Sequence, residues 1–294
     1  CGDGGSPAFP EAPIWVQATF AGPISLTHFT VTSGNDSPER DPRVWEMQGS
    51  NDGVSFETIF RQDDSAAGIW TARDQVARID LGVPSSAYTT FRFIVSATGL
   101  TTGARFQLGE LELFGNPVLL LDFAGDGPSS SGVSPAPWIS INNLVQDVAF
   151  DLGGGVTITA LDDGFNPNNT AAPGAGAVAN GIDVPQEAND DYLFKIADTA
   201  GTEARMRIDG LPAGNYDVTV FEGRTTDANQ VGKIWVGDEP AAANTSSFAG
   251  GSATVSVTVG AGDSVWYKHL EDGSGGISGM IIGKIGAEGA PLVA

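Results

Sequence analysis

The chain is poor in the residue types on which most metal centres and many catalytic sites depend. Its 294 residues include one cysteine and two histidines. A single cysteine excludes an internal disulfide and any zinc site built on several cysteines. Two histidines exclude a histidine-rich metal site, and both His28 and His269 lie in alternating segments typical of strands. A Ser-His-Asp triad would have to use one of them, and no G-x-S-x-G motif is near either.

Basic residues are scarce as well. The chain has 14 Lys and Arg against 36 Asp and Glu, which gives a net charge of −22 at pH 7. Phosphate backbones and anionic lipids repel such a charge, so we expect no nucleic-acid partner and no anionic membrane surface as a partner. No apolar run reaches the length of about 20 residues that a membrane span requires. The composition favours a secreted or cell-surface protein.

Glycine is abundant, at 40 residues, and apolar residues mostly alternate with polar ones. This period of two predicts an all-β chain without a helical domain. The predicted strands of the first half are Trp15–Phe20, Ser25–Thr32, Val44–Gly49, Glu57–Arg61, Val76–Leu81, Thr90–Ala97 and Leu108–Phe114. Those of the second half are Val118–Phe123, Val156–Ala160, Tyr192–Ile196, Ala204–Ile208, Asn215–Glu222, Lys233–Val236, Ala253–Val259, Val265–His269 and Ile277–Ile282.

A domain boundary is predicted at Gly115-Asn116-Pro117, because proline ends a strand and a new apolar run follows at once. The predicted domains are residues 1–116 and 117–286, followed by a tail at 287–294. A linker this short implies two modules in near-fixed relation.

The first half contains several motifs of one known family. They are the T-S-G-N-D loop, R-D-P before the strand with Trp45, the G-S-N-D-G corner and the closing E-L-E-L-F-G. Over residues 9–115 the chain resembles the discoidin (coagulation factor 5/8 type C) family of galactose-binding-like β-sandwiches. The resemblance implies a module, mostly non-catalytic, that binds sugars, lipid head groups or proteins through loops at one end.

The second half resembles a galactose-binding-like jelly roll more weakly. The motifs are the opening L-L-D-F, the turn L-P-A-G-x-Y, F-E-G-R and the closing G-x-I-x-G-M-I-I, over residues 117–285. Turn-plus-strand patterns of this kind occur in many sandwiches. The predicted fold is therefore all-β, with two tandem β-sandwich (galactose-binding-like jelly-roll) domains.

The loop Ser33–Arg43 is a candidate ligand site. Its polar side chains include Asn35, Asp36, Arg40 and Arg43. Carboxylates and arginine forks of this kind suit a hydroxylated ligand, because arginine donates paired hydrogen bonds. The other interpretation is an internally paired loop, in which Asp36 or Asp41 holds Arg40 and fixes the strand connection.

Tryptophan rings are candidate sugar-stacking platforms. Trp45, Trp235 and Trp266 lie within alternating strands, which predicts core positions. Trp70 in SAAGIWTARD and Trp138 in SPAPWIS lie in loop-like segments, which makes them the better ligand candidates.

Calcium is the predicted cofactor. The loop 161–169 offers Asp162, Asp163, Asn166 and Asn168 as oxygen ligands, although its spacing is not that of an EF-hand. The resemblance to discoidin modules implies a second site at Glu110, where a glutamate completes a structural calcium site in that family. The alternatives are a solvated loop and an exposed strand carboxylate.

The leading functional hypothesis is a non-catalytic carbohydrate-binding or adhesion protein, with an extracellular polysaccharide or glycan as partner. The rival is a structural subunit of an extracellular filament or surface layer. The resembled family has an opening strand before the strand matched by Ile14–Phe20, and residues 1–13 contain none, so an open sheet edge could recruit another chain. Cys1 fits a processing cut or a lipidated N-terminus. A third hypothesis, an accessory part of a glycoside-active enzyme, needs a carboxylate pair that sequence cannot locate.

Overall fold

The structure is a computed structural model that divides into two compact units, residues 1–117 with 287–294 and residues 118–286. The predicted boundary lies one residue from this division, and the predicted tail lies outside the described residues. Those described are 13–63, 68–82, 84–100, 105–123, 134–142, 144–161, 164–168, 177–179, 182–190, 192–195, 203–221, 230–247, 252–270 and 276–285. In these residues nearly every element is a strand, so the all-β prediction is confirmed.

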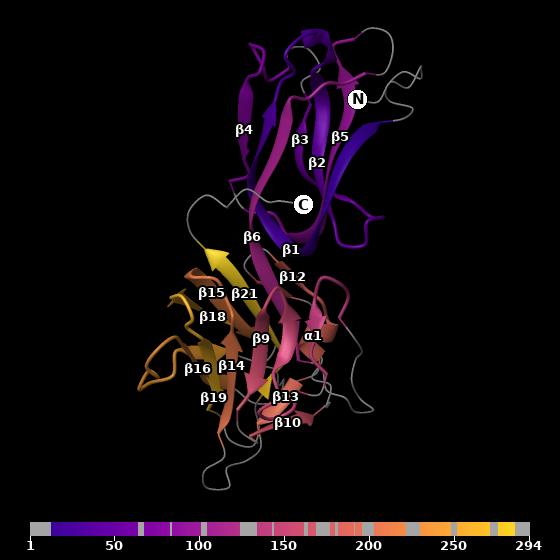
Figure 1. The fold of residues 1–294 in the computed structure, drawn as a ribbon. Coiled ribbons are helices and arrows are strands. Elements are labelled where there is room, and N and C mark those ends of the chain that lie inside the picture. Colours follow the sequence, from indigo (N-terminus) through magenta and orange to yellow (C-terminus); the bar gives the residue numbers. More distant parts are fainter. Residues whose placement is uncertain are drawn as a thin grey trace. The chain divides into compact units, whose positions relative to one another are not determined.

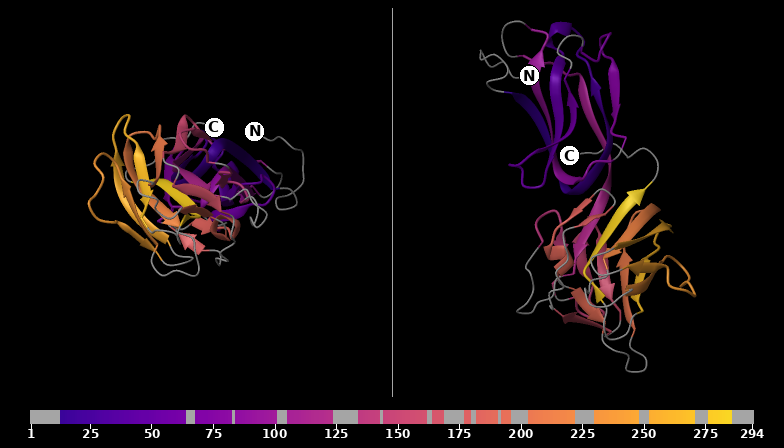
Figure 2. Two further views of the ribbon diagram at one scale, coloured as in Figure 1. Left: turned by 90° about the horizontal axis from the view of Figure 1, so that it is seen from below. Right: turned by 180° about the vertical axis from the view of Figure 1, so that it is seen from behind.

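Unit 1 is a sandwich of two antiparallel sheets (Figures 1 and 2). Its elements are β1 (Ile14–Thr32), the 3-10 helix η1 (Pro38–Arg40), β2 (Pro42–Ser50), β3 (Glu57–Gln62), β4 (Val76–Asp80), β5 (Ala87–Thr98) and the first part of β6 (Glu110–Asp122). The long strand β1 belongs to both sheets. Its first part pairs with β5, and its last part pairs with β4 and β6. The change occurs at an irregularity between Thr19 and Ile24.

The core of unit 1 is aromatic. Trp45 is completely buried and lies 4.8 Å from Phe93 and 5.4 Å from Phe60, measured between ring centroids. Phe29 meets both Trp45 and Phe60 edge-on. Alternation along each strand places these rings inward and polar residues outward. The predicted core position of Trp45 is confirmed.

Unit 2 is built from shorter strands, and its described part includes one helical turn. Its elements are the last part of β6, β7 (Ile139–Ser140), β8 (Phe150–Gly153), β9 (Val156–Ala160), β10 (Phe165–Asn168), β11 (Ala177–Ala179), β12 (Ile182–Val184), α1 (Glu187–Asp190), β13 (Tyr192–Lys195), β14 (Ala204–Asp209), β15 (Gly214–Phe221), β16 (Gln230–Trp235), β17 (Thr245–Ser247), β18 (Ser252–Val259), β19 (Val265–His269), β20 (Gly276–Ile277) and β21 (Gly279–Ile285).

Two sheets carry the core of unit 2. One runs β18-β15-β21-β6, with β7 parallel to β6, and the other runs β17-β16-β19-β14-β9-β8. Val218 and Met280 of the first sheet belong to the same buried cluster as Ile208 and Tyr267 of the second. Trp235 is 8 % exposed, whereas Trp266 is only half-buried and stacks on it at 5.9 Å. The predicted core position is therefore confirmed for Trp235, whereas Trp266 is only partly buried.

The predicted strand break at Pro117 is wrong, because β6 continues through it. Residues 110–117 of β6 pair with β1, and residues 118–122 pair with β21. Proline has no N–H group to donate to a ladder. At Pro117 the strand changes its partner, so the missing donor interrupts no continuous ladder.

Candidate functional site

Three loops meet at the end of unit 1 where β1 stops at Thr32. The main chain of Ser33 donates to Gln75 O at 3.0 Å, and Gly109 N donates to Thr32 O at 2.8 Å. Gln107 N donates to Arg40 O at 3.0 Å. A side chain at Gly34 would collide with Gln107, since an added Cβ would lie 2.3 Å from its Nε2 atom. The loop 33–41 is thus packed directly against the residues that precede β6.

Arg73 holds this loop in shape. Its Nη1 and Nη2 atoms donate to Oδ1 and Oδ2 of Asp41 at 2.9 and 2.5 Å. Nη1 also donates to the carbonyl oxygens of Gly34 at 3.3 Å and Asp36 at 3.2 Å. The hydrogen bonds to Asp41 raise the pKa of the Arg73 guanidinium above its ordinary value, and the Asp41 charge adds to the effect. A two-pronged arginine–carboxylate pair fixes direction as well as distance.

The sequence correctly predicted an internally paired loop, but it assigned the pair to the wrong arginine. The expectation was that Arg40 pairs with Asp36 or Asp41, whereas the carboxylate of Asp41 is held by Arg73, which lies 32 residues away along the chain. Arg40 instead ends η1 and is half-buried.

The loop 33–41 carries three of the predicted ligand residues, Asn35, Asp36 and Arg40, and the fourth, Arg43, follows it. Asn35 and Asp36 are exposed, and Asn35 Oδ1 accepts a hydrogen bond from Gln107 Nε2 at 3.2 Å. Arg43 lies in β2, and its guanidinium covers Gly99, where an added Cβ would come within 2.7 Å of Nη2. The arrangement offers an amide, a carboxylate and guanidinium groups on a fixed backbone. Such groups can bind sugar hydroxyls, and that role remains a prediction.

Neither predicted tryptophan offers an open ring face. Trp70 is 7 % exposed and donates its indole N–H to Val31 O at 3.2 Å, so it belongs to the core of unit 1. Trp138 in unit 2 is 8 % exposed. The expectation that a loop-like segment leaves its ring exposed is therefore wrong for both residues.

The calcium prediction falls largely outside the described residues. Asp162 and Asp163 are not described, and Asn166 and Asn168 lie in β10 with side chains that are not described. Glu110 is exposed at the start of β6. Within the described part of the chain, no group of three or more His, Cys, Asp or Glu is placed to hold a metal. Calcium requires six to eight oxygens, and the family site implied by the resemblance takes most of them from backbone carbonyls, so calcium at Glu110 stays a prediction.

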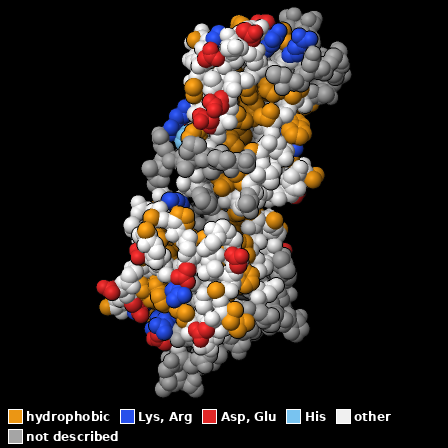
Figure 3. Space-filling model, viewed as in Figure 1, with side chains coloured by type: hydrophobic (Ala, Val, Ile, Leu, Met, Phe, Trp, Pro, Cys, Tyr) orange, Lys and Arg blue, Asp and Glu red, His pale blue; other side chains and the backbone are white. Residues whose placement is uncertain are grey.

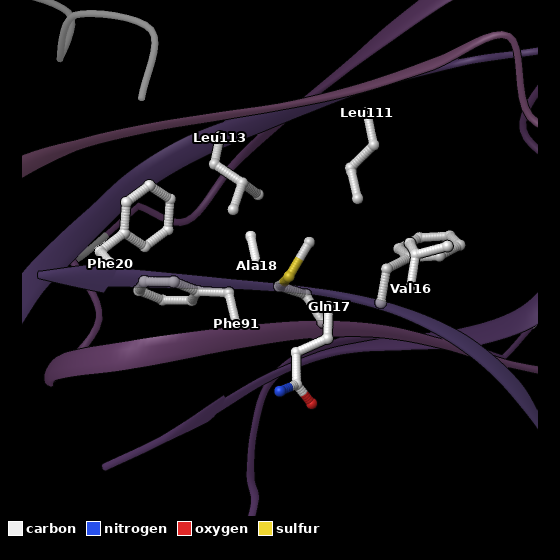
Figure 4. Close-up of a pocket in the computed structure, with 9 residues that line it drawn as sticks. Val16, Gln17, Ala18, Phe20, Phe91, Leu111 and Leu113 are labelled. Atoms are coloured by element: carbon white, nitrogen blue, oxygen red, sulfur yellow. The ribbon is translucent and has the colours of Figure 1, made fainter. Parts of the chain in front are cut away.

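An apolar slot opens along one side of unit 1 (Figures 3 and 4). It has a volume of about 270 Å³ and lies between Val16, Ala18 and Phe20 of β1 and Leu111 and Leu113 of β6. Figure 4 shows the two leucines facing Ala18 and Phe91, while the Gln17 amide points to the other side of β1. Among the described residues, no strand pairs with the free side of Ile14–Thr19. The slot therefore lies beside an open sheet edge.

Sequence reasoning missed the aromatic ring that is most exposed among the described residues. Trp15 is 49 % exposed and faces outward from β1, next to Arg92 of β5. The signal was in the sequence, because the alternation of IWVQATF puts Trp15 on the same face as Gln17 and Thr19. A tryptophan in a polar stripe is a surface residue.

No protein-family model matches the chain. It is 32 % identical over 90 residues to a peptide-N(4)-(N-acetyl-beta-glucosaminyl)asparagine amidase of Arabidopsis thaliana, which is 30 % of this chain and 12 % of the relative. The chain thus spans a small fraction of that protein's length.

Among solved structures the chain is similar to a fucolectin from striped bass serum, with 16 % identity, a TM-score of 0.33, and 92 % and 82 % of the two chains covered. It is also similar to two CBM32 domains with the M60 catalytic domain of ZmpB from Clostridium perfringens, with 9 % identity, a TM-score of 0.30, and 96 % and 34 % covered. Yeast allantoicase gives 10 % identity, a TM-score of 0.29, and 94 % and 79 % covered. TM-scores this low do not support an argument about the fold, which is instead defined by the strand order and pairing of each unit.

Proposed function

We propose that this chain is a non-catalytic carbohydrate-binding or adhesion protein, secreted or held at a cell surface, whose ligand is an extracellular polysaccharide or glycan. The observation that carries the proposal is the rigid polar loop 33–41. Arg73 fixes its backbone, so Asn35, Asp36 and Arg40 are presented with a lower ordering cost at binding. The partial sequence match to an amidase named for glycosylated asparagine also supports a sugar ligand.

The net charge agrees with this proposal. At −22 the chain is unlike a nucleic-acid-binding protein, whose surface must be basic. No helix in the described part of the chain is long and apolar enough to cross a membrane.

A glycan array, followed by calorimetry, tests the proposal. The wild-type chain should bind at least one glycan, and the double variant Asn35→Ala/Asp36→Ala should bind it at least tenfold more weakly. The matched control is Asp80→Ala, because Asp80 is also an exposed aspartate and lies at the far end of β4 from these loops. Absence of binding by the wild type, with and without calcium, contradicts the proposal. Release of reducing ends from a polysaccharide by the pure chain contradicts its non-catalytic part.

The apolar slot favours a second candidate function, assembly into a filament or surface layer by strand exchange. An edge of β1 that pairs with no strand in the described part of the chain, beside a slot of about 270 Å³, suits a strand whose alternate side chains insert between the sheets. Val16 lines the slot and is 40 % exposed. In sedimentation velocity the wild type should then form polymers, and Val16→Lys should not. The control is Val54→Lys, at an 83 % exposed turn position. A wild-type monomer at high concentration removes this candidate.

A further inference from the structure

We propose that the outer face of the β3-β2-β5-β1 sheet of unit 1 is a second glycan-binding surface, centred on Trp15 and specific for an uncharged oligosaccharide. This inference rests on the proposed carbohydrate-binding function, but it concerns a different part of the unit from the loops at the end of β1. Its experiment is arranged so that the two can fail separately.

The strand register puts a continuous polar row across this face. Gln17 of β1 is opposite Arg92 of β5, Arg92 is opposite Gln48 of β2, and Gln48 is opposite Thr58 of β3. With strands about 4.8 Å apart, the row is roughly 14 Å long. Such a surface is wide enough for an oligosaccharide rather than a single sugar.

Trp15 stands beside this row with its ring held in place. The Arg92 guanidinium lies 4.5 Å from the centre of the Trp15 ring and 3.5 Å from that of Phe56. Gln17 Oε1 accepts hydrogen bonds from Arg92 Nε at 3.1 Å and Nη2 at 2.8 Å. The planar cation thus contacts two rings and is fixed by the Gln17 amide, which is a favourable arrangement for arginine.

The exposure of Trp15 is the unusual part of this arrangement. At 49 % exposed, much of the indole faces water although the ring is oriented by Arg92. A large exposed aromatic side chain costs free energy that burial would recover. A fixed, half-exposed indole beside amide and hydroxyl groups has the features of a platform for the C–H face of a sugar, since aromatic rings combine contact area with low conformational entropy.

The charged groups of the face are already engaged by neighbouring side chains, which points to a neutral ligand. Glu46 Oε2 accepts from Gln48 Nε2 at 2.8 Å and from Thr58 Oγ1 at 2.7 Å, and Glu46 Oε1 lies 3.4 Å from Arg61 Nη1. The charge of Arg92 faces two rings and the Gln17 amide oxygen. An acidic polysaccharide would in addition meet the overall repulsion of a chain with net charge −22.

Calorimetry of the full chain tests the inference. The probes are the linear hexasaccharides of glucose, xylose, mannose and galactose, with hexagalacturonate as the acidic comparison. At least one neutral hexasaccharide should bind, and hexagalacturonate should bind at least tenfold more weakly than it. Trp15→Ala should weaken the neutral ligand at least tenfold, with Trp15→Phe between that variant and the wild type. The control is Val76→Ala, at a 58 % exposed position of β4 in the other sheet.

The loop variant Asn35→Ala/Asp36→Ala separates the two proposals. If no glycan binds the wild type, the proposed function and this inference both fail. Suppose instead that a glycan binds the wild type, is lost by the loop variant and is kept by Trp15→Ala. In that case only this inference is overturned. Gln48→Ala provides a second test on the same face if Trp15→Ala does not fold, and unchanged affinity in Gln48→Ala then overturns the inference. Tighter binding of hexagalacturonate than of every neutral hexasaccharide overturns the assigned ligand class.

Discussion

Arg73 holds both carboxylate oxygens of Asp41, with N–O distances of 2.9 and 2.5 Å. The pair joins the loop that follows β1 to the loop that precedes β4. The side chain of Asp41 is 9 % exposed and that of Arg73 is 27 % exposed. The pair is therefore mostly shielded from water, where a fork-shaped hydrogen-bonded pair is most effective. The order of the candidate loop site depends on this contact.

Replacing Arg73 should loosen the candidate site. Arg73→Ala leaves the mostly buried Asp41 carboxylate without its partner, so we expect a lower melting temperature and glycan binding weakened on the order of tenfold. Arg73→Lys keeps the charge but not the planar fork, so its melting temperature and glycan affinity should lie between those of the wild type and Arg73→Ala. Thermal melting and calorimetry measure these effects, with Arg78→Ala as the exposed control. Unchanged binding in Arg73→Ala would show that the loop does not contact the glycan.

Asp122 should make the stability of unit 2 depend on pH. The residue is fully buried, and its Oδ2 atom accepts hydrogen bonds from Ser140 Oγ at 2.8 Å and Ser134 N at 3.3 Å. Its Oδ1 atom has no hydrogen-bond partner among the described residues. Burial raises the pKa of Asp122 above its ordinary value, and the hydrogen bonds from the two serines oppose this shift.

A raised pKa means that the folded chain holds the proton more tightly than the unfolded chain does. The contribution of Asp122 to the free energy of unfolding is therefore full at low pH and is lost as pH rises through the folded-state pKa. Asp122→Asn does not titrate, so the variant should gain stability relative to the wild type as pH rises. Urea unfolding at pH 4, 6 and 8 measures the difference, with the exposed Asp238→Asn as control. A difference that is constant with pH contradicts this account.

Trp45 should dominate the stability of unit 1. It is fully buried among Phe29, Phe60 and Phe93, so Trp45→Ala should lower the free energy of unfolding by about 3–5 kcal/mol. Its indole N–H has no hydrogen-bond partner among the described residues, and a buried unpaired donor is itself destabilising. Trp45→Phe removes that donor and keeps an aromatic ring, so it should cost only about 1–2 kcal/mol. Equal losses in the two variants, measured by urea unfolding, would indicate that the indole N–H is satisfied.

Calcium removal tests the cofactor prediction. If Asp162 and Asp163 hold calcium, excess chelator should lower the melting temperature, because a ligand that binds only the folded state stabilises it. The variant Asp162→Asn/Asp163→Asn should then melt at the chelated temperature with or without calcium. Glu110→Gln is the comparison for the other predicted position and should retain the calcium response. A melting curve unaffected by chelator removes calcium from the account.

Strand positions could be predicted from the sequence because they depend on local alternation. The run YTTFRFIV lies within β5, and its buried residues Phe91, Phe93 and Val95 alternate with Arg92 and Ile94, which are less buried. The local rule that proline ends a strand failed at Pro117, because proline disfavours a ladder only where its N–H would be needed. Whether that donor is needed depends on which strands lie alongside, and this is not a local property.

The sequence by itself determined the all-β class, most of the longer strands and the buried position of Trp45. All of these follow from periodicity and composition, which are present in any short window of the chain. The tertiary structure decided that Asp41 is held by Arg73 rather than Arg40, that Trp70 is buried, and that Trp15 is the exposed ring beside Arg92. These outcomes depend on which distant segments pack together, and pairing across dozens of residues is set by the burial of the whole sandwich rather than by the local sequence.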